Sequence, residues 1–228
     1  MEFIDIHTHG QFPYETEHDV TYIKSLSDTE LLAHQKEGLF SAGIHPWWTL
    51  DYSPEELQQF KDKILHLCQT KSLFAIGETG LDRVYKETFA LQLELFSWHI
   101  DLADKEQLPL IVHSVRSGSD ILAILKEKKP RSPWIFHDFR GNMELVSAIT
   151  KLHPHVYFSF GISLDNSQAV RELVRDLKME NIFLETDAQK HLDIKDIYLR
   201  ASEQLGMDQD LVKSLLFQNF KRLCNKIS

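Results

Sequence analysis

Short apolar segments alternate with longer amphipathic segments along almost the whole chain. This alternation is typical of βα units, in which helices cover parallel strands. Eight apolar segments have the length and residue types of strands: Glu2–His7, Val20–Lys24, Leu39–Ile44, Leu73–Gly77, Leu110–His113, Trp134–His137, Val156–Phe160 and Ile182–Glu185. Seven segments have helical periodicity and turn signals at their ends: Pro54–Gln69, Lys86–Glu106, Gly118–Lys128, Gly141–Leu152, Asn166–Met179, Lys195–Leu205 and Asp208–Asn225. This pattern predicts a compact (β/α)8 TIM barrel of the α/β class.

One side of the predicted barrel has little room for helices. Only Gly10–Asp19 separates the first two strands, and Pro13 lies within it, so we expect a loop in place of the first crossover helix. The segment Asp28–Glu37, before the third strand, can form a short helix at most. We therefore expect an irregular barrel near strands 1 and 2. Because no linker composition interrupts the chain, residues 1–228 are predicted to form one domain.

The charge and the ends of the chain exclude several classes of protein. A formal net charge of −9 argues against a broad basic face for nucleic acid, so any such role must be local. No basic leader and no long apolar run occurs, which predicts a cytoplasmic protein with no membrane association. Cys68 and Cys224 have no CxxC partner and are expected to be small buried residues rather than a disulfide. No obligate protein partner is evident.

Histidine is the unusual component, with 12 residues, and imidazole is the commonest metal ligand. The first strand ends in His7-Thr8-His9, and alternation along the strand puts both rings with Asp5 on one face, leaving Ile4 and Ile6 to pack on helices. A second triplet, His153–His155, precedes strand seven and lies at the end of a barrel where active sites are not built. We interpret only the first triplet as a candidate metal site.

Ligand-type residues also follow four other strands, at the end of a TIM barrel where active sites are built. They are Glu78, His113, His137 and Asp187. For any one of them, a hydrogen-bonded polar residue at a strand end is the plainer interpretation. As a set with His7 and His9, they predict a metal centre.

Four imidazoles and two carboxylates are too many donors for one four-coordinate catalytic ion that keeps a position open. Two divalent ions fit better, with Glu78 bridging them. Histidine and carboxylate ligands suit Zn²⁺, Mg²⁺ or Mn²⁺. Such a centre can activate water and accept an anionic phosphate, which reconciles an acidic protein with a phosphodiester substrate.

The chain resembles the TatD family of metal-dependent deoxyribonucleases, within the wider amidohydrolase-like barrels. Seven segments in the family's order carry this resemblance: FIDIHTH, GIHPW, IGETGLD, LPLIVHS, FHDFRGN, FLETDA and QNFKRLC. The resemblance implies one metal held by His7, His9, Glu78 and Asp187, and a second held by Glu78, His113 and His137. Glu78 and Asp187 would be the catalytic residues, with Asp187 accepting a proton from the attacking water.

The resemblance extends to two candidate substrate-binding residues, His45 and Arg116. For His45 the alternative is a strand-end residue bonded to backbone, and for Arg116 a surface charge at a helix start. The chain departs from the family at Arg140, where Cys-Phe-Ser-Gly is the commoner pattern, and after Ala188, where a proline is usual. Both departures leave substrate choice open.

Other residues have weaker assignments. Asp5 is expected to orient His7 or His9, as carboxylates often do for metal-bound imidazoles, and could alternatively bind the metal itself. Glu185 should point inward with Asp187 and pair with Lys or Arg. Trp47 and Trp48 could stack on bases of a single strand or pack together at the barrel rim.

The sequence thus predicts a TatD-like hydrolase that cleaves phosphodiester bonds of DNA, as a 3'-5' exonuclease or an endonuclease, by means of water activated between two metals. The alternative with the same centre is a small-molecule amidase or lactonase. A third possibility, a binding protein that keeps the fold, is disfavoured because all six ligand positions are filled.

Overall fold

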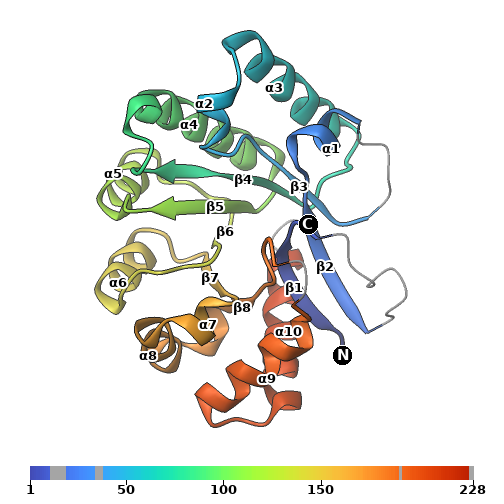
Figure 1. The fold of residues 1–228 in the computed structure, drawn as a ribbon, viewed down its shortest axis with the longest axis vertical. Helices are drawn as coiled ribbons and strands as arrows, with labels where there is room; N and C mark the ends of the chain where they lie inside the picture. The colour runs from blue at the N-terminus through green and yellow to red at the C-terminus, as the bar shows by residue number, and fades with distance from the viewer. Residues whose placement is uncertain (11–18, 34–37, 190–191, 226–228) are drawn as a thin grey trace.

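The fold is that of a computed structural model, which describes residues 1–10, 19–33, 38–189 and 192–225 (Figure 1). Eight parallel strands form one sheet in chain order: β1 Phe3–Thr8, β2 Val20–Ser25, β3 Phe40–Ala42, β4 Ala75–Asp82, β5 Leu110–Val115, β6 Trp134–Phe136, β7 Val156–Phe160 and β8 Ile182–Leu184. Past the end of β8, Asp187 forms a parallel bridge with Thr8 of β1. This bridge nearly closes the sheet into the predicted TIM barrel.

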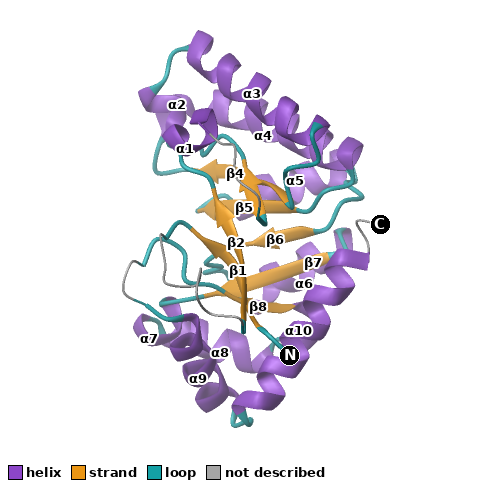
Figure 2. Ribbon diagram, turned by 90° about the vertical axis from the view of Figure 1, so that its right-hand side faces the viewer, coloured by secondary structure: helices purple, strands orange, loops and turns teal. Residues whose placement is uncertain are grey.

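Helices cover the outside of the barrel (Figure 2). Those of the described residues are α1 Asp28–Ala33, α2 Trp48–Asp51, α3 Pro54–Gln69, α4 Phe89–Glu106, α5 Gly118–Lys128, α6 Met143–Leu152, α7 Ser163–Asn166, α8 Gln168–Asp176, α9 Ile194–Leu205 and α10 Gln209–Asn225, with short 3-10 turns η2 Lys86–Thr88 and η3 Met179–Asn181. None of them has the length and apolar character needed to cross a lipid bilayer.

Local signals in the sequence set several of these boundaries. Ser53 begins α3 with a capping box, in which its hydroxyl and the side chain of Glu56 each accept a backbone N–H of the other residue. Asn142 and Asp193 cap α6 and α9 with their side chains. The left-handed Gly206 ends α9.

Two apolar clusters hold the barrel together. The larger one lies between the strands and the covering helices. The smaller one includes residues from seven of the strands, packed against the C-terminal helix α10: Ile4, Ile6, Ile23, Ala75, Ile111, Ile135, Tyr157 and Phe183, with Phe217, Phe220 and Leu223 of α10. It fills the barrel interior, and α10 packs against it.

The inner cluster corrects the prediction for the first strand. Ile4 and Ile6 point into the barrel rather than onto helices. The pairing of β1 with β2 shifts register between Asp5 and Thr8. This irregularity breaks the simple alternation, and His7 therefore reaches the interior although Ile6 does so too.

Other predictions hold with smaller changes. The expected short helix after the second strand is α1, and no helix occurs in the described residues between β1 and β2, although residues 11–18 lie outside the described part. The predicted helix Asn166–Met179 corresponds to α8 but is too long at both ends, because Ser167 ends α7 and caps α8 with its hydroxyl, and α8 ends at Asp176. The strands β4 and β5 continue beyond Gly77 and His113, to Asp82 and Val115.

Candidate metal centre

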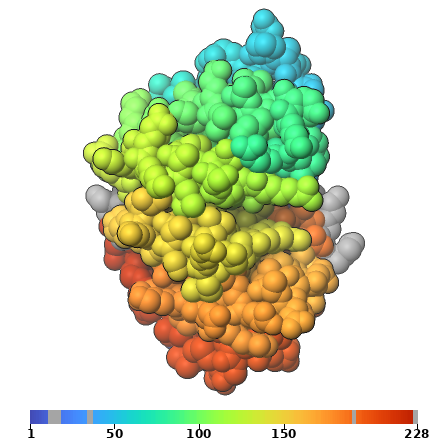
Figure 3. All heavy atoms as spheres, turned by 90° about the vertical axis from the view of Figure 1, so that its left-hand side faces the viewer, coloured from blue at the N-terminus to red at the C-terminus, as the bar shows by residue number. Residues whose placement is uncertain are grey.

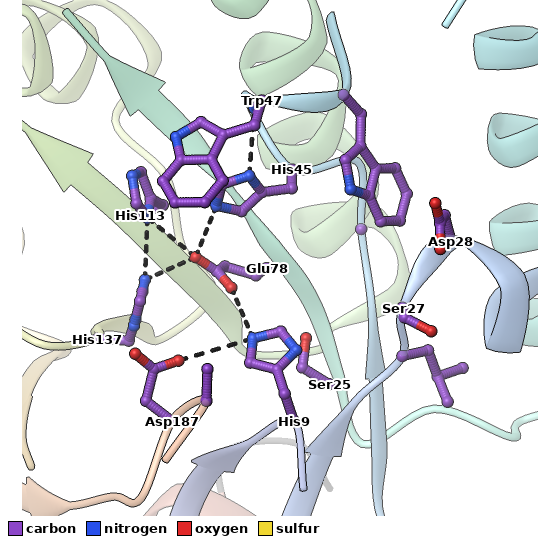
Figure 4. Close-up of a pocket in the computed structure, with 14 residues that line it drawn as sticks. His9, Ser25, Ser27, Asp28, His45, Trp47, Glu78, His113, His137 and Asp187 are labelled. Atoms are coloured by element: carbon purple, nitrogen blue, oxygen red, sulfur yellow. Dashed lines mark hydrogen bonds and ion pairs between the residues drawn. The ribbon is translucent and has the colours of Figure 1, made fainter. Parts of the chain in front are cut away.

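The structure brings the six predicted ligands together at the C-terminal ends of the strands. All of them except His7 are labelled in Figure 4. His7 lies in β1 and His9 follows it directly, while His137 and Asp187 lie beyond the ends of β6 and β8. Glu78 and His113 were expected after their strands, but they lie within β4 and β5. Donor atoms from these residues form groups whose members lie within 4.8 Å of one another.

Glu78 stands at the middle of the cluster, with its two carboxylate oxygens facing opposite sides. Its Oε2 lies 3.4 Å from Nε2 of His7 and 3.1 Å from Nε2 of His9. Its Oε1 lies 2.9 Å from Nδ1 of His113 and 2.7 Å from Nε2 of His137. The two oxygens therefore face different groups of imidazoles, which is the arrangement of a carboxylate that bridges two cations.

Two further carboxylates orient the rings of His113 and His137. The Nε2 of His113 faces Oδ2 of Asp82 at 3.4 Å, and the Nδ1 of His137 faces Oε1 of Glu185 at 3.6 Å. The other ring nitrogens face Oε1 of Glu78, so each ring lies between two carboxylates. With a cation bound beside Glu78, Asp82 and Glu185 would accept the ring protons, and the nitrogens on the Glu78 side would present their lone pairs. These two lone-pair nitrogens lie 3.1 Å apart beside Glu78. A cation would satisfy both of them.

The opposite side of Glu78 is made by His7, His9 and Asp187. The Oδ1 of Asp187 lies 3.6 Å from Nε2 of His7 and 3.7 Å from Nε2 of His9. His7 is fully buried, and neither of its ring nitrogens has a hydrogen-bond partner among the described residues. An unpaired buried imidazole nitrogen is costly, and a metal ion at Glu78 Oε2 would remove that cost.

The cluster is electrostatically suited to positive charge. Burial favours neutral forms, yet the neighbouring carboxylates Asp187 and Glu78 raise the pKa of His7 to about 9. Burial opposes ionisation of Glu78 as well, but the imidazoles of His137 and His45 hold its pKa well below the usual range. The pKa of Asp187 falls to about 2 against the effect of burial, because the imidazole of His7 lies 3.6 Å from its Oδ1 and favours its negative charge. Cations are thus favoured at this position.

His45 has a different role from the six ligands, although its Nε2 lies 3.0 Å from Oε1 of Glu78. Its Nδ1 accepts the backbone N–H of Trp47 at 3.1 Å, and burial lowers its pKa. The neutral ring therefore carries its proton on Nε2 and acts as a hydrogen-bond donor towards the centre. A donor here fits an anionic substrate better than it fits a metal.

The network around the cluster differs from the sequence analysis at two residues. Asp5 does not bond to a ligand imidazole in the described hydrogen bonds; its carboxylate accepts the backbone N–H and hydroxyl of Thr186, and burial raises its pKa to about 7. Glu185 pairs with His137 rather than with Lys or Arg, and it also accepts the hydroxyl of Ser159 and the N–H of Asp138.

Asp82 is the site residue that sequence analysis missed. It accepts Nε1–H of Trp47 at 2.8 Å as well as facing His113, and these bonds lower its pKa to about 2 although burial opposes this. One sequence signal could have pointed to Asp82: it lies four residues after Glu78, on the same strand. The apolar pattern stops at Gly77 and so hides the continuation of that strand. Asp82 thus joins a candidate ligand to an exposed aromatic ring.

Glycine explains how β4 carries Glu78 so deep between its neighbours. Gly80 has a φ of +147°, and a Cβ atom there would lie 2.0 Å from the carbonyl oxygen of His113. Only glycine permits this close approach of β4 to β5. The two ligand-bearing strands can therefore lie close together because Gly80 has no side chain.

Two hollows open beside the centre. The first, about 330 Å³, includes His9, Glu78 and Asp187 and extends along Trp47, which is 46% exposed, and Trp48. The second, about 530 Å³, begins at His113 and His137 and continues to Arg116. The structure thus places Arg116 near the centre, directly after β5, but outside the hollow that contains Glu78.

Comparison with known protein families gives a clear result for this fold and cluster. The family model described as "TatD related DNase" matches residues 15–225. The chain belongs to the TatD family. This membership confirms the resemblance carried by the seven sequence segments.

Individual relatives agree with the TatD assignment. Over 162 residues, 70% of this chain, the chain is 30% identical to the uncharacterized metal-dependent hydrolase YcfH of Escherichia coli. It is 30% identical over 151 residues to the 3'-5' RNA nuclease TATDN2 of Homo sapiens, covering 64% of this chain and 19% of TATDN2. The match spans only 58% of the length of YcfH.

A solved structure supports the fold over nearly its full length. The crystal structure of YJJV, a TatD homolog from Escherichia coli K12, superimposes with a TM-score of 0.80 over 97% of each chain at 20% identity. At this level of identity the likeness concerns the barrel. The ligand set and the substrate must be argued from the residues of this chain.

Proposed function

We propose that this TatD-family protein is a two-metal hydrolase that cleaves phosphodiester bonds of DNA, in the cytoplasm and with residues 1–228 acting as one catalytic domain. The observation that carries the proposal is the placement of Glu78, whose two oxygens face two separate groups of imidazoles. A site for a single ion would not need imidazoles on both oxygens of Glu78.

The donor set fits two divalent ions. His7, His9, Asp187 and Oε2 of Glu78 would hold one, and His113, His137 and Oε1 of Glu78 the other. When bound, such ions lower the pKa of water and neutralise charge on phosphoryl oxygens. Oxygen and imidazole donors suit Zn²⁺, Mg²⁺ and Mn²⁺, and the identity of the metal is left to experiment.

The protein's own residues supply orientation and proton transfer. The side chain of Asp187 is 29% exposed and lines the first hollow, so its carboxylate can take a proton from a water that attacks there. The Nε2–H of His45 faces Oε1 on the other side of Glu78 and lines the same hollow, so it can donate to a phosphate oxygen there. Asp82 and Glu185 keep the rings of His113 and His137 in the required tautomers.

The surroundings of the centre favour a nucleotide chain over a small amide or lactone. Trp47 offers an exposed ring whose indole nitrogen is fixed by Asp82, and such a ring can stack on a base of any sequence. Arg116 adds a cation near the other side of the centre. Together they match the base and the phosphate of a nucleotide.

The proposal can be tested with the purified full chain and one substitution at the bridge. With Mg²⁺, Mn²⁺ or Zn²⁺, we expect cleavage of single-stranded DNA, and we expect Glu78→Gln to reduce kcat by at least ~100-fold because the bridge between the ions loses its charge. The matched control is Glu203→Gln on the exposed surface of α9, which should behave as the wild type. The metal content of each variant is measured on the same samples.

The outcome also separates the alternatives. Hydrolysis of esters or lactones without cleavage of DNA would replace the nuclease by a small-molecule hydrolase. Cleavage of RNA alone would keep the chemistry, in line with the name of TATDN2, and would correct the substrate. No hydrolysis with any metal, or equal activity of Glu78→Gln, would refute the proposed function.

A further inference from the structure

The second hollow lies next to the metal centre and shares His113 and His137 with the first. It is bounded by the start of α5 and by the segment that leads into α6, two helices that lie side by side on the face in Figure 3. Its volume of about 530 Å³ exceeds that of the first hollow. The proposed reaction at the metal ligands leaves most of this space without a role.

The charges around this hollow are mainly positive. Arg116 and Arg140 are both exposed and both line it, each three residues after a candidate ligand, His113 and His137. Asp138 is the one carboxylate among its lining residues. The first hollow differs, because its lining combines Trp47 and Trp48 with Asp28 and has no Lys or Arg.

Arg140 is held in place rather than free to swing. Its Nε and Nη2 donate to Oδ2 of Asp138 at 2.9 and 2.7 Å. Asp138 in turn is fixed by its own N–H, which donates to Glu185 at 2.8 Å. The bonds to Asp138 leave Nη1 of the guanidinium for an anion. An arginine held this way loses little side-chain entropy when it binds phosphate.

The start of α5 adds to the same field. Ser117 and Gly118 line the hollow, and α5 runs for 11 residues from Gly118, so the positive end of its dipole opens there. The Arg pair and the helix end thus act on the same space. In a chain of net charge −9, such a local excess of positive charge is needed if a polyanion is to be held.

We propose that this hollow binds a second, non-scissile phosphate of the nucleotide chain, and that Arg140 and Arg116 make the enzyme prefer substrates with a phosphate next to the one that is cleaved. The inference rests on the proposed function and specifies its substrate. Arg140 is a specificity-determining residue in this account, because it contacts the substrate away from the reacting atoms.

The test compares two substrates that differ in the neighbouring phosphate. Bis(p-nitrophenyl) phosphate has a single phosphodiester, whereas a short oligothymidylate has phosphates on both sides of the cleaved bond. For Arg140→Ser we expect kcat/KM on the oligothymidylate to fall about tenfold, mainly through KM, as for the loss of one charged hydrogen bond. On bis(p-nitrophenyl) phosphate the same variant should change by less than about twofold.

A matched control and the salt dependence exclude a general effect of charge. Arg131 is an exposed arginine before β6, at the opposite end of the barrel, and Arg131→Ser should leave both substrates unaffected. Losing one phosphate contact should also reduce the slope of log kcat/KM against log salt concentration by about 0.7 for Arg140→Ser. Equal losses on both substrates, or no loss on the oligothymidylate, would overturn the proposal.

Binding without cleavage separates this inference from the proposed function. In EDTA, a fluorescent thymidylate trimer should bind the wild type and Arg131→Ser alike, and Arg140→Ser several-fold more weakly. Equal binding by Arg140→Ser, or no binding by the wild type, refutes the phosphate site. If the trimer binds as expected but the metal-loaded protein cleaves neither substrate, the phosphate site stands and the hydrolytic function fails.

Discussion

Acidification should weaken the folded state of the metal-free protein through one buried histidine, His99. Its Nε2 accepts the backbone N–H of Ile44 at 3.0 Å, and its Nδ1 lies 2.7 Å from the carbonyl oxygen of Leu95 and 3.1 Å from the hydroxyl of Thr79. Nδ1 therefore carries the single proton, and a second proton on Nε2 would face an N–H group. Burial lowers the pKa of His99 from 6.5 to about 3.

The sign and the size of the effect follow from these two pKa values. Below pH 6.5 the unfolded chain takes up a proton at His99, whereas the folded chain does so only near pH 3. The stability contributed by neutral His99 is therefore present at pH 7 and is lost as the pH falls. Between pH 7 and 5 the loss amounts to about 2 kcal/mol in the free energy of unfolding.

The assay is urea unfolding in EDTA at pH 7, 6 and 5, for the wild type and for His99→Gln. Glutamine can accept from the Ile44 N–H and donate to Leu95 without titrating, so the variant should lose about 2 kcal/mol less than the wild type over this range. The other titrating histidines are common to both proteins and cancel in the comparison. Parallel pH profiles for the two proteins would refute the assignment of His99 as a neutral buried hydrogen-bond acceptor.

Three further predictions concern the site. Glu185→Gln should weaken metal binding about 10- to 100-fold at the side of the centre that contains His137, because the ligand loses the carboxylate that orients it. Isothermal titration with Mn²⁺ measures this, and an unchanged affinity would show that Glu185 has no such role. Trp47→Leu should weaken binding of a thymidylate trimer in EDTA by about tenfold, because stacking is worth ~1–3 kcal/mol per base; the fluorescence-anisotropy titration used for Arg140 decides it, and an unaltered affinity would remove Trp47 from the binding surface. Gly80→Ala should lower the free energy of unfolding by at least about 2 kcal/mol, since its methyl group collides with β5, and a urea midpoint equal to that of the wild type would contradict the close approach of β4 to β5.

The barrel could be predicted from sequence because its determinants are local and repeated. Each strand is a short apolar run, and each long helix has a buried stripe, so their order is evident without tertiary information. The errors occur where a local bond or a contact between strands decides. Ser167 fits the helical periodicity but uses its hydroxyl to begin a new helix, and Gly77 looks like a strand end although β4 continues through it against β5.

The six candidate ligands could be predicted because the carboxyl ends of parallel strands meet at one end of a barrel. The sequence could not predict which ring nitrogen faces the centre. This depends on partners such as Asp82 and Glu185, which only the fold identifies. The position of His7 depends on a register shift in β1 that simple alternation does not anticipate. The basic hollow was also hidden, because Arg116 and Arg140 come from different βα loops and meet only in space.

The two hollows give the site a direction that the metal ligands alone do not. Glu78 faces imidazoles on both sides, so its position alone does not define the orientation of a bound phosphodiester. Asp28 disfavours a phosphate in the first hollow, where the rings of Trp47 and Trp48 suit a base. Arg116 and Arg140 favour a phosphate in the second. Under the proposed function, an extended nucleotide chain would therefore place a base on the tryptophans and its next phosphate at the arginines. This asymmetry would allow an acidic protein to hold a polyanion without a broad basic surface.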